Sequence, residues 1–233
     1  MSHTPFWLVI PAAGIGSRMQ AACPKQYLTV AGKTILEITL GCFLAHPSVR
    51  GIVLALAKHD SWWPQLDLAA HPLIHTTTGG VERADSVLNA LSVLSDNGAQ
   101  ADDWVLVHDA ARPLLAREDL DRLLAGLAND PVGGLLAVPA RDTLKQVNPD
   151  GCVVKTIDRS VIWHALTPQM FRFGVLQRAL TDALQAGVAV TDESSAIEWA
   201  GLTPRVIEGR ASNIKITRPE DLQVLQSLLF TDL

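Results

Sequence analysis

Apolar runs of strand length alternate with helical patterns through residue 139. The run Phe6–Ile10 is apolar at every position, which is typical of a strand buried on both faces of a sheet. Similar runs follow at 51–57, 73–77, 104–108 and 134–139. Between them, Thr34 and Glu37 form a capping box that starts a helix running to about Ala45, and helical stripes occupy 83–94 and 118–128. This alternation predicts an α/β fold: a Rossmann-like open, mostly parallel sheet with helices on both faces.

A polar stretch at about 141–168 interrupts this order. Its short alternating segments, 143–147 and 153–157, flank the turn sequence Asn148–Gly151, and together they predict a projecting β-hairpin. A two-stranded ribbon is only marginally stable in water, so it needs a surface to pack on. We expect that surface to be a second subunit, which makes this β-arm the dimerisation element of a homodimer.

Helical and strand patterns resume after the arm. Helices are expected at 173–186 and 193–200, strands at 205–208 and 213–216, and a last helix from a cap at 217–220 through Leu229. The chain contains no internal repeat, low-complexity tract or linker. We therefore expect residues 1–233 to form a single domain, with the arm at about 141–168.

Composition and charge argue against several classes of protein. With 233 residues, 48% of them hydrophobic, the chain can bury the core of one large domain. The net charge is −5 at pH 7 and no run of Lys or Arg occurs, which argues against nucleic acid as a partner. Cys23, Cys42 and Cys152 are far apart and form no CxxC pair, so neither a disulfide framework nor a zinc site is expected. No segment has the pattern of a signal or membrane helix, and we expect a cytoplasmic protein without a membrane partner.

The exit of the first strand carries the first candidate chemistry. Residues 11–18 have the sequence PAAGIGSR, and PKQ follows at 24–26. In an open parallel sheet, ligands bind beyond the carboxyl ends of the strands. Small residues there let backbone N–H groups approach phosphate oxygens, and Arg18 and Lys25 add positive charge. The segment therefore predicts a phosphate-binding loop.

Other interpretations of this loop are weaker. Gly14 and Gly16 alone fit an ordinary tight turn about equally well. A dinucleotide-binding fold, as in an NAD-dependent dehydrogenase, would place a third glycine where Met19 stands, and no GxxxxGK[ST] sequence is present. The combination of glycines with Arg18 and Lys25 on one loop favours a nucleotide phosphate over these alternatives.

Two further strand exits carry polar side chains. Gly79–Ser86 follows the third run, where backbone groups near Gly80 and the hydroxyl of Ser86 suit a pyrimidine base or ribose, although an ordinary glycine-rich helix start also fits. Asp109 follows the fourth run, and a carboxylate facing a triphosphate there suits Mg²⁺, with other divalent metals possible. It also fits the cap of the next turn. His108 is expected to pack or to form hydrogen bonds rather than to catalyse.

Several segments of the sequence resemble one known family. They are PAAGIGSRM, PKQY, GGVERADSV, VHDAARP, RDTLK, IDRSVIWHALTPQ, TDESSA and NIKITRPED. Together they resemble the sugar-phosphate nucleotidyltransferases and, more narrowly, the 2-C-methyl-D-erythritol 4-phosphate cytidylyltransferase family, over nearly the whole chain. The resemblance implies a nucleotidyltransferase that joins CTP to 2-C-methyl-D-erythritol 4-phosphate. The implied products are 4-diphosphocytidyl-2-C-methyl-D-erythritol and pyrophosphate, in non-mevalonate isoprenoid precursor synthesis.

The resemblance also implies roles for individual residues. It implies catalytic roles for Arg18, Lys25, Arg159 and Lys215. Residues implied to bind the nucleotide are Pro11, Ala12, Ala13, Gly14, Gly16, Gly80, Arg83, Ser86, Asp109, Ala110 and Arg112. Residues implied to bind the polyol phosphate are Thr143, Arg159, Thr167, Thr191 and Lys215, with the arm reaching the neighbouring subunit's site. Asp109 is implied to hold the Mg²⁺ ion, and Ser212 stands where many members of the family have aspartate.

The expected reaction brings two polyanions together, so cations must offset their repulsion. Arg18 and Lys25 would stabilise charge on the α-phosphate and the leaving pyrophosphate, while Arg159 and Lys215 would hold the attacking phosphate. That phosphate is already anionic, so no general base is needed. Two alternatives stay open: a ribitol 5-phosphate cytidylyltransferase with a different pocket, and a non-catalytic nucleotide-binding regulator.

Overall fold

A seven-stranded sheet forms the centre of the computed structural model, which describes residues 4–14, 19 and 23–230. The strand order is β11-β7-β10-β6-β1-β4-β5. The strands are β1 (Phe6–Pro11), β4 (Val49–Leu56), β5 (Ile74–Thr78), β6 (Trp104–Val107), β7 (Gly133–Pro139), β10 (Trp163–Arg172) and β11 (Arg205–Glu208). Only β10 runs antiparallel to its neighbours within this described sheet, so the prediction of a mostly parallel sheet is confirmed.

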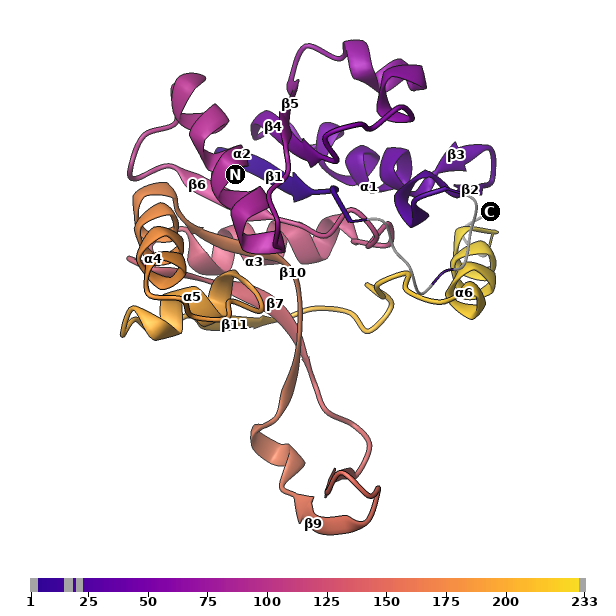
Figure 1. Cartoon of the computed structure of the whole chain (residues 1–233), viewed down its shortest axis with the longest axis vertical. Helices are drawn as coiled ribbons and strands as arrows, with labels where there is room; N and C mark the ends of the chain where they lie inside the picture. The colour runs from indigo at the N-terminus through magenta and orange to yellow at the C-terminus, as the bar shows by residue number, and fades with distance from the viewer. Residues whose placement is uncertain (1–3, 15–18, 20–22, 231–233) are drawn as a thin grey trace.

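Helices cover both faces of the sheet, as the alternating pattern predicted (Figure 1). They are α1 (Ile35–Leu44), α2 (Arg83–Asp96), α3 (Arg117–Leu127), α4 (Phe173–Gln185), α5 (Glu193–Trp199) and α6 (Pro219–Phe230). Short 3₁₀ turns occupy Lys25–Tyr27, Trp63–Gln65, Asp67–Ala70 and Arg159–Val161. Among the described residues, no helix combines the length and the apolar character that crossing a membrane requires.

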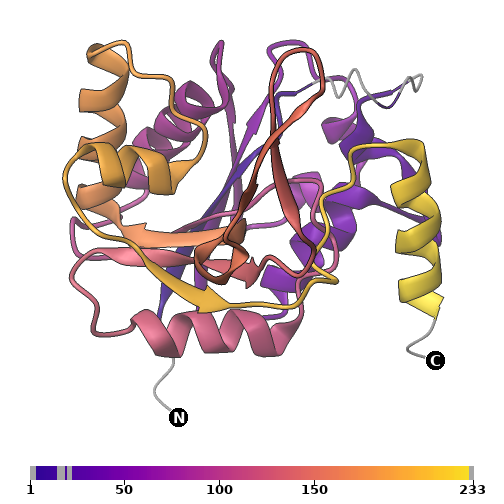
Figure 2. The same cartoon turned by 90° about the horizontal axis from the view of Figure 1, so that it is seen from below.

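The alternation of side chains along β1 explains why the sheet has two cores. Leu8 packs in a cluster with residues of α1 and α3, whereas Val9 packs in a second cluster with residues of α2, α4 and α5. Successive strand residues point to opposite faces, so an all-apolar strand must be covered on both sides. A third, smaller cluster joins α6 to the chain around Ile35. Helix α6 lies on the opposite side of the molecule from α4 (Figures 1 and 2).

Helix α1 starts at the predicted capping box. Thr34 Oγ1 accepts a hydrogen bond from the Glu37 N–H at 3.2 Å, and the Glu37 carboxylate accepts one from the Thr34 N–H at 2.8 Å. Two short strands, β2 (Thr29–Val30) and β3 (Lys33–Thr34), form a separate hairpin just before this helix. The capping box therefore joins the hairpin directly to the first helix and fixes where the helix begins.

The predicted strand at 213–216 is wrong. This segment has no strand structure, and it crosses the loop that follows β6 instead of a sheet edge. The Ile216 N–H donates to the Ala111 carbonyl at 2.8 Å, and the Asn213 carbonyl accepts from the Arg112 guanidinium at 2.7 Å. Its alternating pattern thus reflects burial against a loop, with single backbone and side-chain hydrogen bonds to that loop in place of a strand ladder.

A second hairpin projects from the body, between β7 and β10 (Figure 1). Its strands are β8 (Leu144–Val147) and β9 (Val153–Ile157), which pair antiparallel around the turn that begins at Asn148. The following strand β10 returns to the central sheet, pairing first with β7 and then, from Gln169, with β6 as well. The hairpin is therefore connected to the body through two strands of the central sheet.

Candidate functional site

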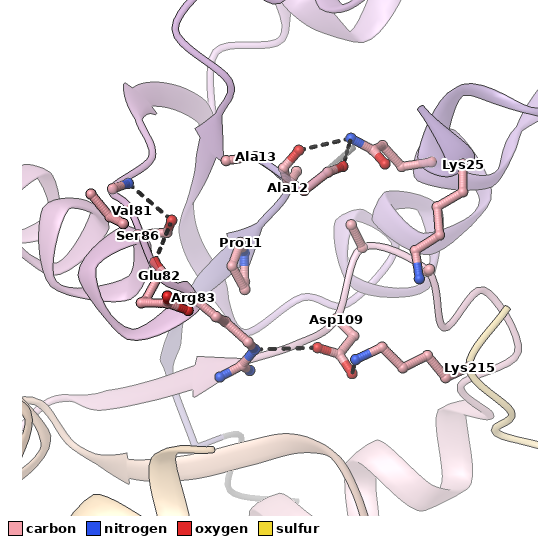
Figure 3. Close-up of a pocket in the computed structure, with 15 residues that line it drawn as sticks. Pro11, Ala12, Ala13, Lys25, Val81, Glu82, Arg83, Ser86, Asp109 and Lys215 are labelled. Atoms are coloured by element: carbon pink, nitrogen blue, oxygen red, sulfur yellow. Dashed lines mark hydrogen bonds and ion pairs between the residues drawn. The ribbon is translucent and has the colours of Figure 1, made fainter. Parts of the chain in front are cut away.

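A pocket of about 310 Å³ lies where β1, β5 and β6 end, at their carboxyl edge. Figure 3 shows the side chains that line it. They are Pro11, Ala12, Ala13, Gly14, Lys25, Gln26, Gly80, Val81, Glu82, Arg83, Ser86, Asp109, Ala110, Ala111 and Lys215. Four chain segments, 11–26, 80–86, 109–111 and the one at Lys215, thus meet at the edge where open parallel sheets bind ligands. Arg18 and Gly16 lie outside the described residues.

Gln26 holds the start of the first loop in place. Its buried side-chain amide donates to the Ala12 carbonyl at 2.8 Å and to the Gly14 carbonyl at 3.3 Å. Both carbonyl oxygens are therefore engaged by the protein itself. A methyl group added at Gly14 would meet no described atom within 4 Å, so the loop is open to the pocket at this point. Gln26 belongs to the PKQ segment of the sequence, but nothing in the spacing of that segment predicted its two hydrogen bonds to the first loop.

The loop after β5 is closely packed, and this explains its two glycines. A Cβ atom at Gly79 would lie 2.4 Å from the Ala13 Cβ, and one at Gly80 would lie 2.1 Å from the Asp85 Cβ. The Gly80 N–H donates to Ser86 Oγ at 3.1 Å. The buried hydroxyl that we expected to contact a ligand therefore fixes the loop at the start of α2. The glycines are required by packing against the protein, whatever ligand the loop meets.

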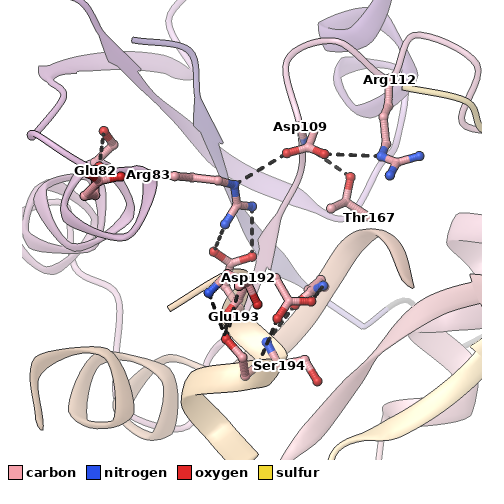
Figure 4. Close-up of polar contacts among 12 residues, drawn as sticks. Glu82, Arg83, Asp109, Arg112, Thr167, Asp192, Glu193 and Ser194 are labelled. Atoms are coloured by element: carbon pink, nitrogen blue, oxygen red, sulfur yellow. Dashed lines mark hydrogen bonds and ion pairs between the residues drawn. The ribbon is translucent and has the colours of Figure 1, made fainter. Parts of the chain in front are cut away.

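Asp109 lies at the centre of a cluster of cations (Figures 3 and 4). Its Oδ2 is 3.0 Å from Lys215 Nζ and 3.2 Å from Arg112 Nε, and its Oδ1 is 3.5 Å from Arg83 Nε. Burial alone would raise the pKa of Asp109, but the charges of these three cations outweigh it and hold that pKa well below its usual range. The carboxylate is therefore ionised at neutral pH.

The chemistry of Asp109 fits a divalent metal that is shared with a substrate. Mg²⁺ usually takes one or two carboxylates together with phosphate oxygens and water. The described residues contain no cluster of three His, Cys, Asp or Glu side chains that would form a complete protein site. Lys215 already occupies Oδ2, so an ion at that oxygen would displace its ammonium group. Asp109 thus suits a metal that arrives with its own phosphate ligands.

Thr167 supports Asp109 from behind the pocket. Its hydroxyl accepts the Asp109 N–H at 3.1 Å and donates to His108 Nδ1 at 2.9 Å. Burial lowers the pKa of His108 to about 4, so the ring is neutral, and its Nε2–H donates to the Arg112 carbonyl at 3.0 Å. The structure therefore places Thr167, expected from the resemblance to contact substrate, in a buried hydrogen-bond network. His108 has the hydrogen-bonding position that was expected of it.

Lys215, in the segment 213–216, lines one side of the pocket. The Lys25 ammonium donates to the Ile216 carbonyl at 2.9 Å, which brings it close to the segment that carries Lys215. Arg112 does not line the pocket; its guanidinium joins Asp109 to the Asn213 carbonyl. Of the four residues expected to catalyse, Lys25 and Lys215 therefore share one pocket.

The remaining expected substrate residues lie elsewhere. Thr143 and Arg159 belong to the projecting hairpin region and are exposed, and the Arg159 guanidinium donates to the Arg141 carbonyl. Thr191 is exposed just before α5, where its N–H donates to Ser195 Oγ at 3.2 Å. None of these three lines the pocket of the described chain.

Glu193 is a buried charge near the pocket that the sequence analysis did not single out. Its two carboxylate oxygens accept from Arg83 Nη1 at 2.6 Å and Nη2 at 3.0 Å. Burial alone would lower the pKa of Arg83, but Glu193 and Asp109 outweigh it and raise that pKa. The acidic pair in TDESSA was the available signal, but it does not tell which partner each carboxylate meets.

The open sheet and the cation-rich pocket at its carboxyl edge define an α/β protein of the nucleotide-binding class. The family model of 2-C-methyl-D-erythritol 4-phosphate cytidylyltransferases matches residues 6–230. The chain belongs to this family.

Curated relatives and solved structures agree with the family model. The chain is 67% identical over 221 residues to the 2-C-methyl-D-erythritol 4-phosphate cytidylyltransferase of Pseudomonas aeruginosa strain UCBPP-PA14, covering 95% of this chain and 94% of the relative. The corresponding protein of Pseudomonas fluorescens strain Pf0-1 is 64% identical with the same coverage. The crystal structure of the Francisella tularensis protein of that name superposes with a TM-score of 0.84 at 39% identity, covering 96% of this chain and 99% of that one.

Proposed function

We propose that this protein transfers the cytidylyl group of CTP to 2-C-methyl-D-erythritol 4-phosphate and releases pyrophosphate. The observation that carries this proposal is the convergence of Lys25, Lys215 and Asp109 in one pocket between the loops that follow β1 and β5. Family membership supplies the substrate pair and the place of the reaction in non-mevalonate isoprenoid precursor synthesis. The pocket supplies what the chemistry needs, a set of fixed cations around a position for phosphates.

The nucleotide is assigned to the two glycine-containing loops. The loop that begins at Pro11 takes the triphosphate, and the loop around Gly80 takes the cytosine base. Asp109 would hold a divalent ion, which we take to be Mg²⁺. When bound, such an ion neutralises and orients the triphosphate oxygens. The fit of Asp109 to one shared ion supports this assignment.

The reaction joins a phosphate oxygen of the polyol phosphate to the α-phosphorus of CTP, and the bond from that phosphorus to the pyrophosphate oxygen breaks. Lys25, together with Arg18, stabilises the negative charge that grows on the α-phosphate and the leaving group. Lys215 holds the attacking phosphate, which Arg159 also binds. No proton has to be removed from the nucleophile, because a phosphate dianion already carries its reactive oxygen.

The projecting hairpin suggests how Arg159 reaches a site. Its apolar side chains are largely exposed, at 53% for Val147 and 60% for Val153, and Val161 near its base is 75% exposed. An exposed apolar ribbon gains stability when a second copy covers it. We propose a homodimer in which the arm of one subunit carries Arg159 and Thr143 to the polyol phosphate in the other.

The cysteine thiols of the chain support a proposal for its cellular compartment. Cys23, Cys42 and Cys152 are all free. Free cysteines persist where glutathione and thioredoxin keep them reduced. We therefore propose that the protein acts in the cytoplasm.

One assay tests the proposed function directly. Purified protein is incubated with CTP, MgCl₂ and 2-C-methyl-D-erythritol 4-phosphate, and pyrophosphate release is followed against the same mixture with ribitol 5-phosphate. We expect pyrophosphate release with 2-C-methyl-D-erythritol 4-phosphate and none with ribitol 5-phosphate. Faster release with ribitol 5-phosphate would favour the rival cytidylyltransferase, and CTP binding without release from either would favour a regulator.

A further inference from the structure

Glu193 is a fully buried carboxylate that meets the pocket wall through Arg83 (Figure 4). It is the first residue of α5, and both of its oxygens accept hydrogen bonds from the Arg83 guanidinium. Two parallel bonds between a guanidinium and a carboxylate fix the orientation of both groups. No step of the proposed reaction uses this pair, although Arg83 lines the nucleotide pocket.

Arg83 stands between two carboxylates. Its terminal nitrogens lie 2.6 Å and 3.0 Å from Glu193, while its Nε lies 3.5 Å from Oδ1 of Asp109. The contact with Asp109 is therefore the longer and weaker of the two. The other oxygen of Asp109 already meets Lys215 and Arg112, so Oδ1 is the oxygen with the loosest protein contact.

We propose that Glu193 is a positioning residue that holds the Arg83 guanidinium away from Asp109, so that Oδ1 stays available to the divalent cation that accompanies CTP. This inference rests on the proposed function. Without the Glu193 charge, Arg83 would pair with Asp109 at short range. It would then compete with the metal for the same oxygen, because both are cations drawn to one carboxylate.

Hydrogen bonds from β10 of the central sheet fix the position of Glu193. Gln169 on β10 donates to Asp192 Oδ2 at 2.8 Å and accepts the Ser194 N–H at 2.8 Å. Asp192 in turn caps α5 by accepting the Ser195 N–H at 2.9 Å. The first turn of α5 is thus tied to β10 on both sides of Glu193, so the carboxylate cannot follow Arg83 toward Asp109.

The test measures how strongly Mg²⁺ and CTP assist each other's binding. The dissociation constant of CTP is determined by calorimetry with Mg²⁺ and with EDTA, without polyol phosphate, so that no turnover occurs. The ratio of the two constants is the metal coupling, and it does not depend on the fraction of folded protein. In Glu193→Gln we expect this ratio to fall by about fivefold or more, the scale of couplings between neighbouring sites.

A second substitution separates competition by Arg83 from simple damage. In the double variant Arg83→Gln with Glu193→Gln, the competing cation is gone, so the coupling ratio should recover toward the wild-type value even if CTP binds more weakly overall. Glu198→Gln is the matched control, since Glu198 lies in the same helix, is exposed and accepts a hydrogen bond from Ser194. It should leave the ratio unchanged.

The outcomes distinguish this inference from the proposed function. An unchanged ratio in Glu193→Gln, or a double variant no better than the single one, overturns the positioning role. If Glu193→Gln does not fold, Glu193→Asp keeps the charge and must keep the coupling, and its loss there would also overturn the role. Failure of the wild-type protein to bind CTP more tightly with Mg²⁺ would instead count against the proposed function.

Discussion

Replacing Thr167 with valine separates a supporting role of its hydroxyl from direct contact with substrate. Valine has nearly the shape of threonine, so the change removes the hydroxyl and leaves the packing in place. The hydroxyl accepts the Asp109 N–H and donates to His108 Nδ1, and Thr167 is only 4% exposed. Two buried polar groups would therefore lose their partner at once.

The size of the effect follows from those two groups. A buried donor or acceptor left without a partner costs about 1–3 kcal/mol, so Thr167→Val should lower the free energy of unfolding by about 2–6 kcal/mol. For a chain of this length each kcal/mol corresponds to a fall in Tm of about 2–4 °C. We also expect a lower kcat, because Asp109 is no longer held by its backbone N–H.

Urea unfolding and steady-state kinetics measure the two effects. Thr191→Val is the matched control, since Thr191 is exposed and the family resemblance implies that it too binds the polyol phosphate. It should leave stability unchanged and raise the KM for that substrate. A Thr167→Val protein that unfolds at the wild-type urea concentration while its KM for the polyol phosphate rises would exclude the supporting role, because the hydroxyl would then act on the ligand.

Three further predictions concern charge. Lys25→Ala should lower kcat by about 100- to 1,000-fold without loss of fold, whereas Lys33→Ala, an exposed lysine on β3, should keep wild-type turnover; full activity in the first variant would disprove the charge-stabilising role. Arg159→Ala should raise the KM for the polyol phosphate far more than that for CTP, with Lys145→Ala on the same arm as control; equal effects on both substrates would contradict the arm assignment. The depressed pKa of His108 means that the unfolded chain takes up a proton that the folded protein refuses as pH falls from about 6.5 to about 4, so stability should drop by about 3 kcal/mol across that window. In His108→Asn, the free energy of unfolding measured with urea should depend less on pH than in the wild-type protein. An equal pH dependence in the two proteins would rule out His108 as its source.

Local patterns in the sequence predicted most elements of the fold, but they missed β2, β3 and β10 and placed one strand where the structure has none. The all-apolar run of β1 and the capping box at Thr34 each depend on residues a few positions apart, and both were predicted correctly. The segment 213–216 has the same alternation as a strand, but it packs on a loop. Alternation reports which side chains are buried, and it does not report what the backbone bonds to.

The sequence predicted which residues form the site better than it predicted the hydrogen bonds and ion pairs that connect them. Lys25 and Asp109 could be placed in one pocket because strand exits in a parallel sheet share an edge, whereas Lys215 was assigned to the site only through the family resemblance. The bonds that hold Asp109 and Arg83 join residues 58 and 110 positions apart, to Thr167 and Glu193. No spacing rule encodes such contacts, because they arise only after the sheet has formed. The sequence alone therefore could not distinguish a threonine hydroxyl that forms hydrogen bonds within the protein from one that contacts a ligand.

The hydrogen bond from Lys25 to the Ile216 carbonyl joins segments 191 residues apart, near the two ends of the chain. During synthesis the N-terminal strands emerge from the ribosome first and can begin to pair. The pocket, however, stays open on one side until the segment that carries Lys215 has been translated. A polypeptide released before that point could assemble β1, β4, β5 and β6 but would lack the wall that brings the last cation to Asp109, so a premature stop codon late in the gene would be expected to abolish turnover.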